Sequence, residues 1–473
     1  MPQSTHSFAT GRWQHPAALA FAILFGCAIT VAAQNTTGTA SATTGSVPSG
    51  PATADVRQLT LQDAVHEGLR YNLAVIDSGE NARIARGQRL VALSALLPQV
   101  SAQVSENVQQ LNLATLGLTL PDVPSIIGPF GYSDLQATWN DTLFSFESIR
   151  RFRAARAAEQ AAHLSNEDTL DVVTLAVGNA YLQVIEANSR IEAQEAQVRN
   201  ARVLYNQARD AVEIGTAPRI DVTQTEVQLH TEEYNLSVAR NNFAVAKLNL
   251  ARAIGLPLGQ NFDLADKIPY SDINPMTVDE AIALAYRSRG DFRAALETER
   301  AAEQSLSAAK AERYLTLSTS GNYGVNGQTF GHSHGVFTFT AAASVPIFSG
   351  GRIKGDITQA EAQLRDRKAE VENLRGQIDY DVRAAFLNVN AAKEQVAVAK
   401  QNVDLANDNL TRAKDRFASG VTGSVEVVQA EQALASANDQ YITSLYNHNL
   451  AKLSLARALG IARTSYEQYL RGR

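Results

Sequence analysis

Two histidines, His332 and His334, form the one local pair of side chains in this sequence that could ligate a metal ion. They stand in a Gly-rich segment, and two histidines alone seldom hold a metal, so we expect solvated loop residues. The sequence has no phosphate-binding glycine loop, no metal-spaced Cys or His cluster, and no nucleophile paired with a base. We therefore predict that the chain is not an enzyme and uses no cofactor or metal.

Two short turns place acidic residues at the start of a predicted helix. Each turn contains a glycine, Gly215 or Gly420, where a helix can end in the left-handed conformation. Asp221 and Glu426 follow these glycines and begin the next helices, where the helix dipole favours an anion. Helix initiation is one explanation for the two carboxylates. For Glu426, an acidic ring formed by copies of the chain around one axis is the other.

The two turns occupy equivalent positions in an internal repeat. Residues 181–256 align without a gap with residues 386–461, and the segment 59–65 corresponds to 276–282. Each copy is predicted to run helix, strand, loop, strand, long helix, tight turn and helix. We assign copy one to 57–256 and copy two to 276–462, with a connector at 257–275 and a C-terminal tail at 463–473.

The segment before the first copy indicates export. An apolar run after Arg12 ends in Val31-Ala32-Ala33, which fits a secretory signal peptide over residues 1–33. Cys27, the single cysteine, lies inside it; Leu24–Cys27 loosely resembles a lipoprotein box, but cleavage after Ala33 is the preferred alternative. Residues 34–56 have almost no large apolar side chains and are predicted to be a disordered leader. No later apolar stretch is long enough for a membrane helix.

The predicted helices carry a strict seven-residue repeat. Val389, Val396 and Val403 continue it in copy two, small residues stand three positions after each, and copy one repeats the pattern. Such a repeat is typical of a coiled-coil seam. The long helices, about 148–213 and 351–418, would each span roughly 100 Å. Shorter helices placed end to end would line each long one, and helices alone are compatible with a soluble antiparallel coiled coil.

Four segments alternate between apolar and uncharged polar residues instead. They cover about 98–110, 132–145, 314–327 and 335–348, and each is long enough to cross a bilayer as a tilted strand. Lipid tolerates only closed barrels, and four strands are too few to close one. If the strands span a membrane, the chain must oligomerise, and three copies supply twelve strands. Two hairpins packed on soluble helices are the alternative.

Charge and composition narrow the function classes. The chain has 473 residues, a net charge of −6 and no basic run, so we expect no nucleic-acid partner. Only 7% of its residues are aromatic, as expected for long, closely packed helices. Two classes remain, an outer-membrane channel and a soluble periplasmic coiled-coil adaptor or scaffold protein.

Several motifs together resemble the TolC-like outer membrane factor (outer membrane efflux protein) family over residues 57–462. They are Leu-Thr-Leu-Gln-Asp-Ala at 59–64, Val-Pro-Ile-Phe-Ser-Gly-Gly-Arg at 345–352, and the two helix-turn-helix tips. The resemblance implies a mainly α fold with β strands: a homotrimer whose twelve-stranded outer-membrane β-barrel continues into a long periplasmic helical barrel. It also implies a passive exit duct of a tripartite efflux pump or type I secretion system. The implied partners are outer-membrane lipid, a periplasmic adaptor (membrane fusion) protein and an inner-membrane transporter.

The resemblance assigns roles to the two tips. It implies a periplasmic constriction formed by Asp221, Phe417, Thr422, Glu426 and Gln429. It implies adaptor docking at Gly215, Thr216, Ala217, Pro218, Gly420, Val421, Thr422 and Gly423.

The sequence departs from the family pattern at three tip positions. The family often has Tyr at the position of Phe417, Arg at that of Thr422 and Asp at that of Gln429. Thr422 cannot form the salt bridge to Asp221 that an arginine would form. If Glu426 forms an acidic ring in a trimer, Glu426→Gln should lower the preference for cations.

Overall fold

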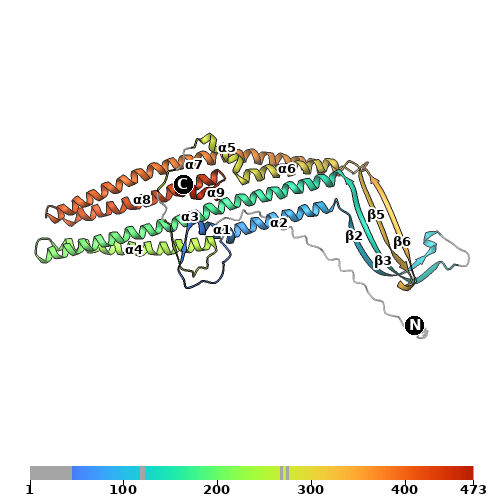
Figure 1. Ribbon diagram of the computed structural model, residues 1–473, viewed down its shortest axis with the longest axis horizontal. Coiled ribbons are helices and arrows are strands. Elements are labelled where there is room, and N and C mark those ends of the chain that lie inside the picture. Colours follow the sequence, from blue (N-terminus) through green and yellow to red (C-terminus); the bar gives the residue numbers. More distant parts are fainter. Residues whose placement is uncertain (1–44, 118–122, 267–269, 273–275, 472–473) are drawn as a thin grey trace, which may run out of the picture. The chain divides into compact units, whose positions relative to one another are not determined.

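The computed structural model describes residues 45–117, 123–266, 270–272 and 276–471. The predicted signal peptide at 1–33, Cys27 within it, and residues 34–44 of the predicted leader lie outside this part of the chain. Within the described residues, both copies follow the predicted order of elements (Figure 1). The two copies are joined through both their helices and their strands.

The elements of each copy follow the repeat. Copy one contains α1 (Leu61–Tyr71), α2 (Leu73–Ser94), β2 (Gln99–Asn112), β3 (Ile126–Ser145), α3 (Phe146–Glu213) and α4 (Arg219–Ile254). Copy two contains α5 (Val278–Ser288), α6 (Gly290–Ala311), β5 (Thr316–Gly327), β6 (Ser333–Ser344), α7 (Arg352–Ala418) and α8 (Ser424–Ala458). The sequence did not predict β1 (Arg57–Leu59), η1 (Leu113–Leu116), β4 (Phe262–Leu264), η2 (Phe330–His332) and α9 (Ala462–Arg471).

One extended residue divides the first helix of each copy, Asn72 between α1 and α2 and Arg289 between α5 and α6. Both α1 and α5 begin with a capping box, formed by the pairs Thr60–Asp63 and Thr277–Glu280. A capping box satisfies backbone N–H groups that have no partner inside the helix. The single predicted helix is therefore two helices in each copy.

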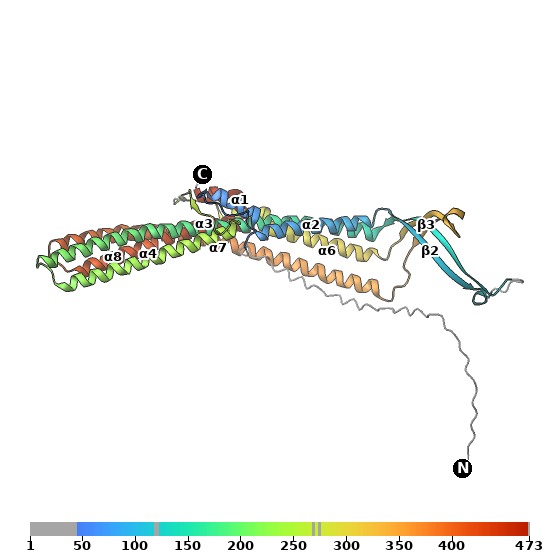
Figure 2. The same cartoon turned by 90° about the horizontal axis from the view of Figure 1, so that it is seen from below.

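The helices are arranged side by side in a fixed order. Toward the two turns at 214–218 and 419–423, which we call the tips, α3 packs against α4 and α8, and α8 packs against α7. Toward the strands, α3 packs against α2 and α6, and α6 packs against α7 (Figure 1, Figure 2). The order is α4-α3-α8-α7 at the tips and α2-α3-α6-α7 at the strands. Short helices thus line each long one, as predicted.

The strands form one antiparallel sheet in the order β2-β3-β5-β6. Its centre joins the copies, since β3 pairs with β5 in a register that places Trp139 opposite Gly321. Phe339 of β6 is opposite the same glycine on its other side. β2 and β6 are the edges of this sheet and pair on one side only.

The predicted strand ends were wrong at two places. β3 begins at Ile126 rather than near 132, because residues 126–130 continue to pair with β2 past a β-bulge. β6 ends at Ser344, so the predicted inclusion of Val345 and Ile347 was wrong. Pro346 lacks the N–H that a ladder needs, and Ile347 is 99% exposed. The segment then turns into α7 through glycines with positive φ.

The predicted two-faced character of the strands is confirmed. One face is apolar and exposed, and it includes Val100, Val104, Val108, Phe337 and Phe339. The other face is polar: Asn322 donates to Gln136 at 2.6 Å, and Ser101 and Thr138 are 2.7 Å apart. It is not uncharged as predicted, because it includes Asp134, whose Oδ1 accepts a hydrogen bond from Gln136 at 2.7 Å. An apolar face left exposed in one chain needs a partner, either lipid or protein.

The part of the predicted leader that the structure describes is not disordered. Val47 N donates to Tyr71 O at 2.9 Å, and Ser49 N donates to Gly255 O at 2.8 Å. Ahead of α1, β1 pairs in parallel with β4 of the connector. The C-terminal tail forms α9, whose Leu470 is fully buried with Leu59 and Phe262. Three-residue strands and a polar leader carry no periodicity, which is why the sequence did not predict these contacts.

The composition of the helix α3 differs from the expectation that no later stretch is long and apolar enough for a membrane helix. Its length and composition would allow it to cross a membrane, although no such helix was predicted after residue 56. Its buried residues include Val173, Val177 and Tyr181, which pack with α1, α4 and α8 in one core cluster. Gly178 permits this close packing, since a Cβ there would lie 2.8 Å from Leu453 Cδ1. α3 is therefore a core helix of the bundle.

A buried ion-pair network fixes the break between α5 and α6. The Arg289 side chain, 7% exposed, donates to Asp291 Oδ2 at 2.6 Å and to Asp381 Oδ2 of α7 at 2.9 Å. Burial opposes the charged form of Asp291, but the hydrogen bond and charge of Arg289 prevail and lower the pKa of this carboxyl group. The network therefore links the break between α5 and α6 of copy two to the neighbouring long helix, α7.

A second buried cation, Lys452 of α8, holds part of the connector. Its Nζ donates to Ser271 O at 3.1 Å and to Ser271 Oγ at 2.9 Å. Burial lowers the pKa of Lys452 to about 8. The pKa of the neighbouring His448 is also lowered by burial.

Lys452→Met should therefore stabilise the protein most near neutral pH. The folded-state pKa of about 8 lies below the ordinary lysine pKa of about 10.5, so the unfolded chain binds more protons between these values. Stability of the natural chain should rise with pH across that window, and the gain from Lys452→Met should shrink. Thermal unfolding followed by circular dichroism from pH 7 to pH 10 would measure the difference. An equal gain at every pH would contradict the titration and leave only a packing effect.

Candidate gate at the helical tips

Hydrogen bonds to a backbone carbonyl group of α3 fix the turn of tip one. Gly215, with φ of +78°, follows the end of α3. Thr216 N and Oγ1 both donate to Ala211 O, at 2.8 and 3.0 Å. Pro218 then precedes α4, where its missing N–H costs nothing because no helical partner would be available. The predicted helix-ending role of the glycine is confirmed.

Tip two has the same plan with different residues. Gly420 has φ of +67°, and Val421 N donates to Arg416 O at 3.0 Å. Gly423 precedes α8, which begins at Ser424. Among the predicted docking residues, Gly215, Thr216, Pro218, Gly420, Val421 and Gly423 are exposed, while Ala217 and Thr422 are half-buried. Both tips therefore present small residues and backbone at the surface.

A small apolar cluster packs the two hairpins together just above the tips. Leu204 of α3 lies with Leu410 of α7 and with Val427 and Leu434 of α8. Phe417, predicted to line the constriction, packs against this cluster and is half-buried. Within one chain Phe417 thus has a packing role.

Asp221 is joined to the other hairpin by Ser424, a residue that the sequence did not single out. Ser424 Oγ donates to Asp221 Oδ1 at 2.8 Å and also lies 3.1 Å from Gln224 Oε1. Ser424 is fully buried and Asp221 is 8% exposed. A neutral hydroxyl therefore makes the contact for which an arginine at position 422 would have been needed.

Glu426 is paired within its own hairpin. Thr422 Oγ1 donates to Glu426 Oε2 at 2.5 Å, and Arg416 Nε lies 3.4 Å from Glu426 Oε1. Gln429 is exposed and lies one turn along α8. The structure thus brings Thr422 and Glu426 together. It brings Asp221 to Ser424 and not to Thr422. It also places the positive charge of Arg416 beside Glu426, which would weaken an acidic ring.

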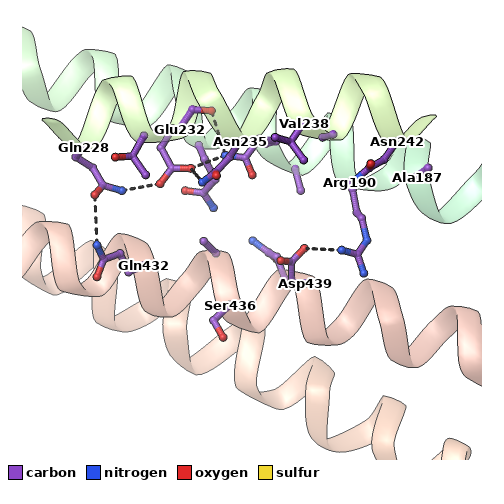
Figure 3. Close-up of a pocket in the computed structure, with 17 residues that line it drawn as sticks. Ala187, Arg190, Gln228, Glu232, Asn235, Val238, Asn242, Gln432, Ser436 and Asp439 are labelled. Carbon is purple, nitrogen blue, oxygen red and sulfur yellow. Dashed lines mark hydrogen bonds and ion pairs between the residues drawn. The ribbon is translucent and has the colours of Figure 1, made fainter. Parts of the chain in front are cut away.

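Above the apolar cluster, a polar groove separates α3 and α4 from α8 (Figure 3). Its volume is about 460 Å³. Gln432 of α8 donates to Gln228 of α4 at 3.3 Å, and Gln228 donates to Glu232 at 2.5 Å. At the far end Arg190 lies 3.9 Å from Asp439. At the groove itself, the two hairpins are therefore joined by hydrogen bonds between polar side chains and one long ion pair, and Arg190 also donates to Thr443 Oγ1 at 3.0 Å.

One buried carboxyl group adjoins this seam. Glu431 of α8 is 3% exposed, and its nearest cation is Lys414 Nζ at 3.6 Å. Burial raises its pKa, and the charge of Glu232 contributes in the same direction. Ser424 and Glu431 are seven residues apart and both buried, so a polar residue repeated at one seam position is the signal that could have identified Ser424. Gln228 and Gln432 have no such signal in the sequence.

The histidine pair of the outer loop lies far along the chain from the tips. His332 Nδ1 is 3.3 Å from Thr329 Oγ1. In the part of the chain that the structure describes, no group of three or more His, Cys, Asp or Glu side chains is placed to hold a metal.

Comparison with known proteins gives a consistent result. A sequence profile described as outer membrane efflux protein matches residues 80–256 and 281–461. The toluene efflux pump outer membrane protein TtgF of Pseudomonas putida is 22% identical over 85% of this chain and 84% of its own length. The alkaline protease secretion protein AprF of Pseudomonas aeruginosa is 22% identical over 67% of this chain and 68% of its own length.

Solved structures show the same fold. The outer membrane protein VceC of Vibrio cholerae superposes with a TM-score of 0.73 at 19% identity, over 85% of this chain and 96% of that chain. The CmeC outer membrane channel of Campylobacter jejuni gives a TM-score of 0.71 at 16% identity, over 85% and 86%.

Proposed function

This chain belongs to the outer membrane efflux protein family, and from that premise we propose that it is an outer-membrane exit duct. Three copies would close a twelve-stranded barrel in the outer membrane and continue it as a helical tube in the periplasm. The duct is passive and would serve a tripartite efflux pump or a type I secretion system. Its tips would meet a periplasmic adaptor protein and, through it, an inner-membrane transporter.

The open edges of the chain carry this proposal. The sheet ends in β2 and β6, each with one unpaired side, while its apolar face is exposed. In lipid an unpaired strand edge leaves backbone groups without partners, so the sheet has to close. Adding β2 of one copy to β6 of the next closes it without any new element.

The layer of helices also has two open edges, as the sheet has. α7 is an edge in both halves, and it exposes Tyr380, Leu387, Val398 and Leu405, separated by seven or eleven residues. The opposite edge, α4, exposes Tyr234, Val238, Val245 and Leu248. Seven- and eleven-residue spacings keep side chains on one helix face. The two stripes are suited to pack on each other between neighbouring copies.

A charge on the lipid-facing side of β6 tests this placement. Phe339→Arg should cost about 2–4 kcal/mol per copy near the bilayer midplane, because lipid cannot solvate the guanidinium group. Thr340→Arg is the matched control, since the next residue of a strand lies on the opposite face. We expect the natural chain and Thr340→Arg to resist carbonate extraction and to form trimers in detergent, and Phe339→Arg to lose both properties.

The soluble adaptor alternative predicts the opposite. Such a protein would be released from membranes by salt or carbonate. Phe339→Arg and Thr340→Arg would then have equal effects on it. The exposed apolar strand faces disfavour this class.

We also infer that the chain acts by opening and closing rather than by catalysis.

Glu426 offers a test of the gate. Glu426→Gln should reduce the preference for cations over anions in planar bilayers, because three carboxylates would leave the narrow end. The change should be modest, since Arg416 already lies beside each carboxylate. Arg416→Gln should change selectivity in the opposite direction. Glu80→Gln, a surface substitution on α2, is the control; unchanged selectivity in both tip variants would leave Glu426 with helix initiation only.

A further inference from the structure

The first turns of α3 contain an unusual concentration of arginine. Arg150, Arg151, Arg153 and Arg156 all lie within its first eleven residues. Positive charges near a helix N-terminus oppose the helix dipole, so the dipole does not favour four arginines at this end of α3. Arg151 pairs with Glu147 at 2.6 Å, and Arg150 donates to Gln304 at 3.2 Å. Among the described residues, Arg153 and Arg156 have no ion-pair partner.

Arg153 and Arg156 line a groove between α3 and α6. The groove has a volume of about 540 Å³, and α6 contributes a third arginine, Arg300. The remaining lining side chains are Ala157, Gln160, Gln304 and one acid, Glu297, which lies 3.4 Å from Arg300. Three cations facing one carboxylate leave the groove with a net positive charge. Its chemistry suits a phosphate or another oxyanion, which guanidinium groups bind in a bidentate manner.

The groove lies on the outer side of the proposed tube. Phe146, Arg153 and Gln160 are seven apart on α3, and Asp171 follows eleven residues later, so all four share one face. Asp171 Oδ1 accepts a hydrogen bond from Arg463 N at the start of α9. α9 packs in one cluster with β1 and β4. Three copies of this extra layer would fill the bore, so the face that carries it points outward.

The groove also lies just beyond the strands. Phe146 forms an aromatic cluster with Phe144 and Tyr314, at ring-centre distances of 4.6 and 5.8 Å. Phe146 and Tyr314 are 47% and 55% exposed, as aromatic side chains at a membrane–water interface are. At ~1.5 Å per residue, Arg153 and Arg156 lie about 10 and 15 Å further along the helix. Long side chains on a helix point back toward its N-terminus, so these two arginines reach toward headgroups that lie at the level of the aromatic cluster.

We propose that the groove between α3 and α6 binds the headgroup phosphate of an anionic phospholipid in the inner leaflet of the outer membrane. The inference rests on the proposed placement of the sheet in that membrane. Basic pockets beside membrane-spanning segments bind anionic headgroups in this way. Arg153 and Arg156 hold the phosphate, and Arg300 closes the groove from the side of α6.

Native mass spectrometry of the detergent-purified full chain tests the site, with phosphatidylglycerol, phosphatidylcholine and inorganic phosphate as probes. The natural chain should retain phosphatidylglycerol in preference to phosphatidylcholine. Arg153→Gln and Arg156→Gln should each weaken phosphatidylglycerol binding about fivefold and have little effect on phosphatidylcholine. Arg300→Gln, on the other helix, should act in the same direction. Inorganic phosphate in excess should not displace the lipid.

The control is the double variant Arg202→Gln, Arg209→Gln, which removes the same charge from exposed positions of α3 near the tip. Equal lipid binding by the control and by Arg153→Gln, Arg156→Gln would overturn the proposal. Displacement by inorganic phosphate would overturn it too, since the site would then recognise a free anion. A chain that remains soluble without detergent would instead overturn the proposed function, and the lipid inference with it.

Discussion

Replacing Ser424 by aspartate should open the tip end of the duct. The new carboxylate would lie beside Asp221, whose Oδ1 is 2.8 Å from Ser424 Oγ, in a site where both residues are buried. Two like charges about 4 Å apart repel by about 4 kcal/mol at an effective dielectric constant near 20. Each neutral hydrogen bond across the seam contributes only about 1 kcal/mol. The repulsion therefore exceeds the contribution of any one of these hydrogen bonds, and it acts beside the apolar cluster that packs the two hairpins together.

Single-channel recordings would measure this opening, and sensitivity of cells to a large antibiotic would report it in vivo. The helix itself should not suffer, because Ser424 is the first residue of α8, where the dipole favours an acid. Lowering the pH should reverse the effect, since the two carboxyl groups can then share a proton. Ser419→Asp adds the same charge to the exposed part of tip two and is the control. Equal conductance in both variants, with trimers intact, would show that Asp221 and Ser424 do not restrain the gate.

Replacing Arg289 by methionine should destabilise the folded chain by about 3–5 kcal/mol. The substitution leaves Asp291 and Asp381 without their shared cation in a partly buried site, and breaking a buried pair on one side costs about this much. Urea unfolding of the detergent-solubilised protein, followed by circular dichroism, would measure the loss.

Arg293→Met is the matched control. Arg293 lies four residues further along and pairs with Glu167 at 3.2 Å in an exposed site, so its loss should cost less than about 1 kcal/mol. Adding Asp291→Asn and Asp381→Asn to Arg289→Met should recover part of the stability. If Arg289→Met and Arg293→Met cost the same, the buried network contributes no more than a surface ion pair.

Much of this fold could be predicted from periodicity. The seven-residue repeat gave α3 and α7 to within two residues at either end, and the alternation of apolar and polar residues gave the four long strands. The breaks at Asn72 and Arg289 could not be predicted, because a single extended residue leaves the helical period on both sides unchanged. The three-residue strands β1 and β4 are too short to show alternation, and their pairing depends on the tertiary fold.

The candidate gate was predicted only in outline. Glycine and acid positions located both tips, because left-handed glycines and helix-starting acids have local signatures. The partner of Asp221 was not predictable, since Ser424 lies about two hundred residues away and resembles an ordinary helix start. The link between Arg416 and Glu426 likewise depends on how the turn brings α7 and α8 together.

The shared order of strands and helices sets a geometric problem at the membrane boundary. Each strand continues into one helix, so a closed assembly would have equal numbers of both around its circumference. Neighbouring strands are about 4.8 Å apart, and the axes of packed helices are about 9 Å apart. A ring of upright strands would therefore have roughly half the circumference of the ring of helices. Tilting the strands by about 45° widens their ring to roughly 7 Å per strand. The remaining difference falls on the junctions between strands and helices, of which the segment 345–351 between β6 and α7 is the longest, with positive φ at Gly350 and Gly351.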